Sequence, residues 1–162
     1  MPHALVTPVL DRSVRGLCAR PYEGHPRGCP NFGKVSRCPP AAPLLFDAFD
    51  ERGPFYVIYS RFPLGEHVRA MRERHPDWSD RQLRCVHLLA EQVKKLREDV
   101  DSFKKIYPEV GWKVETTPEA MGLDVAATLR QAGVDLEWPP HEVATHVALA
   151  GRVAGIVRGD SP

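Results

Sequence analysis

Residues 18–43 read CARPYEGHPRGCPNFGKVSRCPPAAP and contain three of the four cysteines of the chain, Cys18, Cys29 and Cys38. Six of the sixteen prolines fall in the same stretch. Proline fixes φ and has no backbone N–H to donate, so the stretch is predicted to be an irregular loop with a restricted backbone. Our central hypothesis is that the cysteines meet around one metal centre.

The size and composition of the chain predict one globular domain. At 162 residues the chain is long enough for one hydrophobic core and too short for two independent cores. A hydrophobic content of 43% with 27% charged residues is ordinary for a globular domain. The formal net charge of +1 gives no global reason to expect nucleic-acid or membrane binding. We expect a single domain over residues 1–162.

The sequence shows no targeting or membrane segment. No run approaches the roughly 18 apolar residues needed to span a bilayer, and the start MPHALVTPVLDR lacks a basic region and a long apolar core. We therefore expect a cytoplasmic protein with no membrane partner. Without an export signal, metal binding or free thiols are favoured over disulfides for the four cysteines.

The pattern outside the cysteine-rich loop predicts a mixed α/β fold with a small sheet. Strands are expected over 4–10, 55–62, 110–115 and 134–138, and Pro8 would confine the first of them to an edge. Helices are expected within 44–53 and over 64–75, 80–106 and 117–132. The tail 141–158 fits both a helix and a hairpin.

Two of the expected helices bear on function. Ser79 is a suitable N-cap for the long helix 80–106, whose apolar stripe we interpret as a packing surface. For helix 117–132, Thr116 and Glu119 have the spacing of a capping box, and Gly133 suits the C-terminal cap.

The cysteine spacing favours an iron–sulfur cluster over a zinc knuckle. Ten residues separate Cys18 from Cys29 and eight separate Cys29 from Cys38, whereas structural zinc sites commonly use Cys-x2-Cys turns. Cys29 and Cys38 are each followed by proline, as is a cysteine of the bacterial ferredoxin motif. We expect a cluster of the 4Fe–4S type, with zinc as the alternative.

The sequence does not decide which residue is the fourth metal ligand. Cys85 lies in the long predicted helix and could present a single sulfur to the loop. Its alternative role is that of a small buried hydrophobic residue. In that case the fourth position is open, or is filled by His25 or His87.

The loop is also basic and rich in glycine. Gly24, Gly28 and Gly33 permit the positive φ values that wrapping a cluster requires. Between residues 11 and 40 six cations outnumber two anions, which would lower thiol pKa values and could hold a small anionic ligand. The cations are Arg12, Arg15, Arg20, Arg27, Lys34 and Arg37.

Two blocks of sequence resemble a known family. The segment Cys29-Pro-Asn-Phe-Gly-Lys34, followed by Cys38-Pro-Pro40, resembles a signature of a bacterial and archaeal family of unknown function described as predicted metal-binding proteins. The segment Pro118-Glu-Ala-Met-Gly-Leu-Asp-Val125 is similar to the C-terminal helix of that family.

The resemblance implies that Cys18, Cys29 and Cys38 are metal ligands and that Gly122 and Asp124 matter near the site. Asp124 places a carboxylate within an apolar run, and Lys34 could orient a ligand near the sulfurs, so both are candidate cofactor-binding residues. Many family members carry a further cysteine cluster in the middle of the chain, which is absent here, so a second metal site is not expected.

Two functions remain in competition. Four sulfur ligands in a closed shell would favour a structural metal in a small-molecule or partner-binding module. Three sulfurs and an open position would favour an enzyme whose metal binds substrate as a Lewis acid. Neither the phosphate-loop, nor the Gly-x-Ser-x-Gly, nor the His-Glu-x-x-His motif occurs, so those common chemistries lose support.

Overall fold

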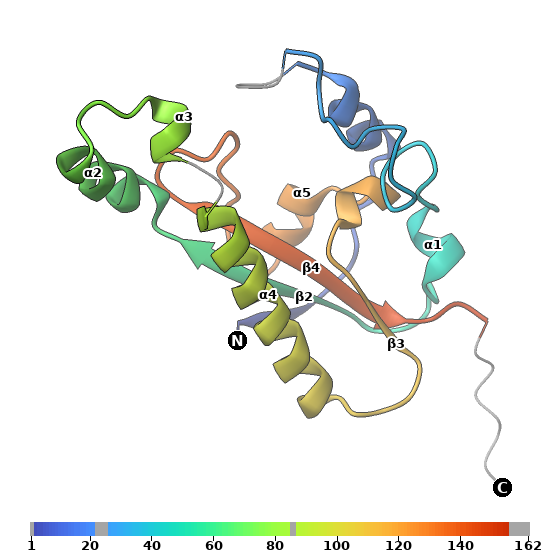
Figure 1. The fold of residues 1–162 in the computed structure, drawn as a ribbon. Coiled ribbons are helices and arrows are strands. Elements are labelled where there is room, and N and C mark those ends of the chain that lie inside the picture. The colour runs from blue at the N-terminus through green and yellow to red at the C-terminus, as the bar shows by residue number, and fades with distance from the viewer. Residues whose placement is uncertain (1, 22–25, 85–86, 156–162) are drawn as a thin grey trace, which may run out of the picture.

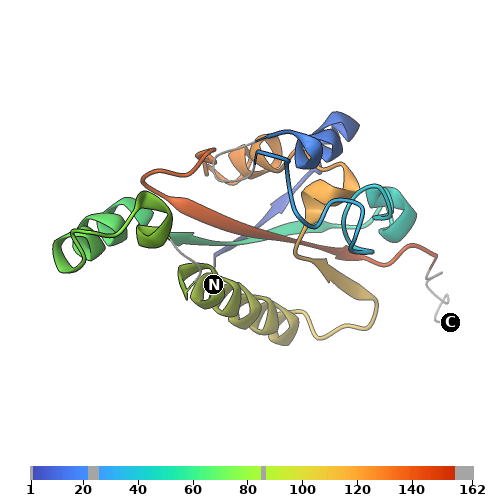
Figure 2. The same cartoon turned by 45° about the horizontal axis from the view of Figure 1, so that its top comes forward.

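A four-stranded antiparallel sheet with helices on both faces forms the centre of the protein (Figures 1 and 2). The computed structural model describes residues 2–21, 26–84 and 87–155. The strands are β1 (His3–Val6), β2 (Phe55–Phe62), β3 (Trp112–Glu115) and β4 (Ala144–Arg152), in the spatial order β1-β2-β4-β3. The predicted mixed α/β class with a small sheet is confirmed.

Strands β2 and β4 form the middle of the sheet. Their Cα register runs from Tyr56 opposite Ala150 to Phe62 opposite Ala144. The prediction of a strand over 55–62 is confirmed with the same bounds, and the ambiguous tail resolves into β4. The small residues of β4 let neighbours pack closely, since a Cβ atom on Gly151 would lie 2.8 Å from the rings of Phe49 and Phe55.

One face of the sheet carries the segment between β1 and β2 and the segment after β3. The elements there are η1 (Arg12–Ala19), α1 (Leu45–Ala48), η2 (Pro118–Met121) and α5 (Val125–Arg130) (Figure 2). They bury one hydrophobic cluster against the sheet, which includes Leu45, Phe49, Phe55, Val57, Met121, Leu123, Leu129 and Leu149. Burial of apolar surface on this face is therefore what holds the cysteine-rich lobe to the sheet.

The opposite face is covered by α4 (His87–Ile106). Leu96, Val100 and Phe103 pack against Ile58 and the alanines of β4. Rings from four elements meet at the end of this helix, namely His3, Tyr56, Phe103, Tyr107 and Trp112. The apolar stripe predicted to be a packing surface is one, although Val93 is 38% exposed.

Two shorter helices lie at the end of the sheet where β2 finishes. They are α2 (Leu64–Arg74), close to the predicted 64–75, and α3 (Asp80–Leu83), which Ser79 caps as expected (Figure 1). The single helix expected over 80–106 is replaced by α3 and α4. Arg84 leaves the helical geometry with φ −89° and ψ 4°, and its guanidinium donates to the carbonyl oxygen of Pro140 at 2.9 Å.

The helix expected over 117–132 is divided at Gly122. This residue has φ 88°, in the left-handed region that favours glycine, and its carbonyl accepts the N–H of Asp11 at 2.9 Å. The capping box expected at Thr116 does not form, because the N-cap is Thr117 and its side chain makes no capping hydrogen bond. Backbone pairing with the N-terminal segment thus replaces continuation of the helix.

The strand expected over 134–138 is wrong, because the structure shows no strand in those residues. The carboxylate of Glu137 instead accepts hydrogen bonds from the backbone N–H groups of His141, Glu142 and Val143. Those bonds shape the loop that leads into β4. Among the described residues, no helix is both long enough and apolar enough to cross a membrane.

Candidate metal centre

The backbone brings Cys18 and Cys29 together. Cys18 lies near the end of η1, and the N–H of Cys29 donates to the carbonyl oxygen of Cys18 at 2.7 Å. No disulfide joins Cys18, Cys29 or Cys38, and each side chain is partly buried. Two sulfurs that are eleven positions apart in the chain therefore start from adjacent backbone segments.

Gly28 makes this close approach possible. Its φ is +76°, and a Cβ atom there would lie 2.7 Å from the carbonyl oxygen of Cys18 and 2.9 Å from the carbonyl carbon of Ala19. Any other residue would push the two segments apart. The geometry needed to bring two sulfurs together is thus built into the backbone at a glycine.

Cys38 is delivered by a compact series of turns. The N–H of Cys38 donates to Val35, and the N–H of Gly33 donates to Pro39 at 2.9 Å. The guanidinium of Arg15 in η1 donates to the carbonyl oxygens of Pro40 at 3.0 Å and Ala42 at 2.7 Å. Arg15 therefore ties the segment that carries Cys38 to the helix that carries Cys18.

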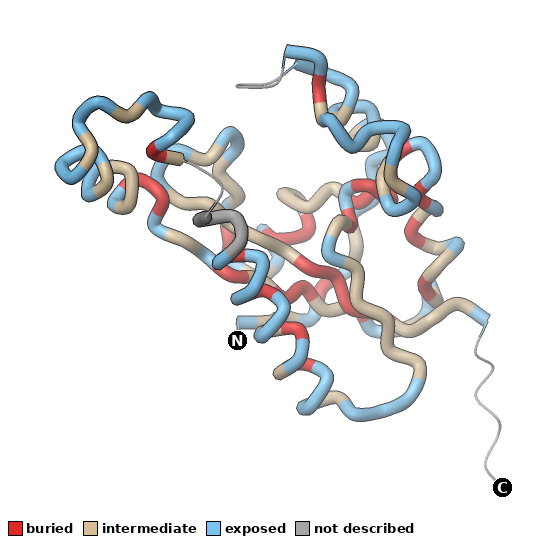
Figure 3. Tube along the Cα trace, in the orientation of Figure 1, coloured by how far each residue is buried: buried red, intermediate tan, exposed pale blue. Residues whose placement is uncertain are grey.

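Little else holds this segment in place. Residues 26–44 contain no helix or strand, which confirms this part of the irregular loop expected over 18–43, whereas Cys18 and Ala19 belong to η1. Most of them are exposed, and the buried ones are only Gly28, Pro39 and Ala42 (Figure 3). Such a segment buries too little apolar surface to offset its own ordering, so a metal cross-link would fit a structural need.

The electrostatics of Cys18 show which groups surround it. Burial is the main cause that raises the pKa of the Cys18 thiol. The ionised forms of Cys29, Glu119 and Cys38 raise that pKa further. The expectation that nearby cations lower the thiol pKa is therefore not met at Cys18. Arg20, Arg27, Lys34 and Arg37 are exposed, where water screens their charge.

Glu119 is the residue that sequence reasoning missed. It lies in η2, which packs against η1, and it was expected only to serve in a capping box. The residue as a whole is exposed, whereas its carboxylate is desolvated enough by surrounding protein for burial to raise its pKa. No sequence signal places it beside Cys18, because the contact depends on η2 packing against η1.

The residue types of the candidate site suit a thiophilic metal, but their side chains are not arranged to bind one. Cys29, Glu119 and Cys38 are near enough to Cys18 to act on its thiol electrostatically, and thiolate and carboxylate are both zinc or iron ligands. Within residues 2–21, 26–84 and 87–155, however, no three such side chains are already arranged to hold a metal ion. Binding would therefore require the side chains of the loop to close around the metal.

Several predicted ligands lie outside what the structure describes. Cys85 and His25 fall in undescribed segments, and the side chain of His87 is likewise not described. Their assignment as ligands stays a prediction. The described part of α4 packs on the face of the sheet opposite to η1 (Figure 2).

The structure shows where the two candidate cofactor-binding residues, Asp124 and Lys34, lie. Asp124 is the N-cap of α5, and its Oδ1 accepts the N–H of Ala127 at 2.9 Å. This local role accounts for a carboxylate within the apolar run. Lys34 is exposed in the loop, four residues before Cys38. A cofactor-binding role for either residue stays a prediction.

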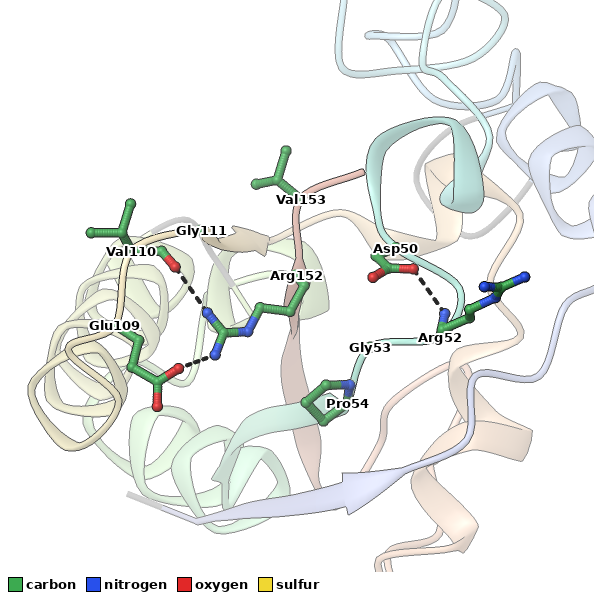
Figure 4. A pocket seen from close by; sticks show the side chains of 9 residues that line it. All are labelled: Asp50, Arg52, Gly53, Pro54, Glu109, Val110, Gly111, Arg152 and Val153. Atoms are coloured by element: carbon green, nitrogen blue, oxygen red, sulfur yellow. Dashed lines mark hydrogen bonds and ion pairs between the residues drawn. The ribbon is translucent and has the colours of Figure 1, made fainter. Parts of the chain in front are cut away.

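A cavity of about 690 Å³ lies around Arg152 at the end of β4, between the loops that precede β2 and β3 (Figure 4). Arg152 donates to the carbonyl oxygen of Val110 at 2.9 Å, pairs with Glu109, and lies over the ring of Trp112 at 4.7 Å. Of the cysteines that the structure describes, Cys18, Cys29 and Cys38, none lines it. Within the cavity, the carboxylate of Asp50 accepts the backbone N–H of Arg52 at 3.0 Å.

Comparison with protein-family models, with curated proteins and with solved structures found no match to this chain. The family resemblance seen in the sequence therefore stays a prediction.

Proposed function

We propose that this protein binds one metal centre through Cys18, Cys29 and Cys38, and that the centre is an iron–sulfur cluster of the 4Fe–4S type. The observation that carries the proposal is the convergence of these three free cysteines through the Cys29-to-Cys18 hydrogen bond and the turns around Cys38. The Cys-Pro steps favour iron–sulfur over zinc, as argued from the sequence.

The chain supplies ligands and a shell for such a group. The three thiols would lose their protons on binding, so metal affinity should rise with pH. When bound, the cluster would supply redox or Lewis-acid chemistry. Exposed cations around the loop, including Arg20 and Lys34, would partly offset the negative charge of the thiolates and attract a small anion.

A structural zinc ion is the second candidate, and the sparse burial of residues 26–44 favours it. In that case the metal would cross-link and stabilise the cysteine-rich lobe, and the lobe would bind a small molecule or a partner. The identity of the bound metal and the presence of acid-labile sulfide distinguish the iron–sulfur cluster from the zinc ion.

Anaerobic purification followed by metal and acid-labile sulfide analysis tests the proposal. We expect iron and sulfide in equal amounts and a broad absorption band in the visible range. Stoichiometric zinc in a colourless protein would replace the cluster with the second candidate. Absence of any metal, also after anaerobic reconstitution with iron and sulfide or with zinc, would reject both.

A further inference from the structure

The cavity around Arg152 has walls that main-chain hydrogen bonds hold in place. The N–H of Asp50 donates to the carbonyl oxygen of Arg152 at 2.8 Å, and the N–H of Val153 donates to that of Gly111 at 2.8 Å. These bonds join the loop before β2 and the loop before β3 to the end of β4. The volume of about 690 Å³ is within the range of small-molecule sites, so the hollow is preformed and large enough for a ligand.

The guanidinium of Arg152 has a fixed orientation at this cavity. It lies over the ring of Trp112 at 4.7 Å, and its Nη1 donates to the carbonyl oxygen of Val110 at 2.9 Å. The stem of the side chain passes close to Gly53, where a Cβ atom would lie 3.1 Å from Cβ of Arg152. A planar cation held in one orientation is the group that binds a carboxylate through two parallel hydrogen bonds.

Glu109 satisfies only part of the carboxylate-binding edge of Arg152. The N–H groups of Nε and Nη2 lie side by side in arginine and can bond the two oxygens of one carboxylate. Glu109 pairs with Nη2, whereas Nε is buried and has no hydrogen-bond partner among the described residues. A buried donor without a partner is rare and costly, so Nε marks where a further acceptor would bind.

Glu109 is the exposed member of its ion pair. Its side chain is 69% exposed, whereas the side chain of Arg152 is 20% exposed. An ion pair with an exposed partner contributes little free energy, so Glu109 can move into solvent at small cost. Arg152 keeps its contacts with Trp112 and Val110 when Glu109 leaves. An incoming carboxylate can therefore replace Glu109 on the guanidinium.

We propose that this cavity binds a small organic carboxylate, which replaces Glu109 and accepts hydrogen bonds from Nε and Nη2 of Arg152 together. Val110 and Pro54 line the cavity and offer apolar surface to the body of such a ligand (Figure 4). The site is independent of the proposed metal centre, because none of the described cysteines lines the cavity.

Titration of the full-length protein with acetate, butyrate and benzoate tests the proposal. NMR follows the arginine Nε–H groups and the backbone amides of residues 109–111, and the Nε–H signal of Arg152 is assigned by its loss in Arg152→Lys. We expect saturable binding of at least one of these carboxylates, with a shift of the Arg152 Nε–H signal. Arg152→Lys keeps the charge but loses the paired donors, so it should weaken binding about tenfold or more. Butyramide, which has the size of butyrate and no charge, should not bind.

Glu109→Gln gives the sharper prediction, because the loss of a competing carboxylate should strengthen binding and an unfolded variant cannot do so. We expect a gain of about two- to fivefold in affinity, which corresponds to the usual contribution of an exposed ion pair. Glu51→Gln is the matched control, since it removes the same charge from an exposed residue close in sequence that does not line the cavity. It should change the affinity much less.

Several outcomes would overturn the carboxylate site. One is a failure of all three carboxylates to bind the wild type and Glu109→Gln. Equal affinities in these two proteins, or an equal gain in Glu51→Gln, would also overturn it. Tighter binding of inorganic phosphate than of every carboxylate would replace it with a phosphate site. Circular dichroism shows whether Arg152→Lys is folded, and the result for Glu109→Gln decides if it is not.

Discussion

The carbonyl oxygen of Cys18 accepts the amide hydrogen of Cys29 at 2.7 Å, and Gly28 is the residue that lets the two backbones meet. This one hydrogen bond turns two distant cysteines into neighbours. Arg15 then adds the third, because its guanidinium binds the carbonyl groups of Pro40 and Ala42 just beyond Cys38. One main-chain hydrogen bond and the side chain of Arg15 therefore organise the candidate centre.

Gly28→Ala should weaken metal binding and stability together. A Cβ atom there meets the Cys18 carbonyl group, and the positive φ adds a backbone cost of about 1 to 2 kcal/mol. Gly33→Ala is the matched control, since Gly33 has φ +70° and open space around its Cβ position. Denaturant unfolding and metal titration should show the larger loss for Gly28→Ala. Equal losses would mean that the close approach to Cys18 is unimportant.

Arg15→Gln should release the segment that carries Cys38. Two hydrogen bonds from a charged donor to main-chain carbonyl groups disappear, and each contributes about 1.5 to 3 kcal/mol in favourable cases. We expect lower metal affinity and faster proteolysis within residues 26–44. Arg20→Gln removes the same charge from an exposed position nearby and should cause much the smaller loss in both measurements, because water screens that charge. If both variants lose metal affinity and resistance to proteolysis equally, the positive charge and not the two hydrogen bonds of Arg15 is responsible.

Asp124 allows its capping role to be separated from metal binding. Asp124→Ala removes the acceptor for the N–H of Ala127 and should lower the free energy of unfolding by about 1 kcal/mol. Asp124→Asn keeps an N-cap acceptor and removes the charge, so it should keep stability. If Asp124→Asn also keeps metal content, the carboxylate serves α5 alone. A loss of metal with intact stability would support the cofactor role expected from the sequence.

Stability should fall as the pH falls below about 6.5 because of His146. Burial lowers the pKa of this histidine from its ordinary value of 6.5, so the unfolded chain binds the proton more readily. The contribution of neutral His146 to the free energy of unfolding is present above the pKa of the histidine in the unfolded chain. It is lost as the pH falls through the pKa of His146 in the folded protein. Unfolding midpoints compared between about pH 7.5 and about pH 5.5 measure the loss.

His146→Gln should flatten this part of the pH profile. Wild-type pH dependence in His146→Gln would show that another group is responsible.

The sequence predicted the elements whose pattern is local. Strand β2 was predicted with its observed bounds, because aromatic and β-branched residues between Pro54 and Pro63 define it without reference to the rest of the chain. The tail was ambiguous, because alanine, glycine and valine satisfy both periodicities until β2 and β3 pair with it. Pairing partners are a property of the fold, so the pattern alone could not decide between helix and strand.

The errors have the same origin. The helix expected over 117–132 is interrupted because the backbone near Gly122 and Asp124 pairs with Val9 and Asp11, which lie more than a hundred positions away. The same tertiary pairing packs η2 against η1, and no local pattern in the sequence could predict it. The structure brings the backbones of Cys18 and Cys29 together, and the metal site expected from Cys18, Cys29 and Cys38 stays a prediction.

Differential alkylation tests the central claim most directly. The metal-loaded protein is first treated with one isotopic form of a thiol reagent. After the metal has been removed with a chelator, the protein is treated with a second isotopic form. Peptide mass spectrometry then shows which form each cysteine carries. We predict that Cys18, Cys29 and Cys38 are protected together by metal and become reactive at the same chelator concentration. Independent reactivities that do not respond to metal would contradict the three-cysteine centre.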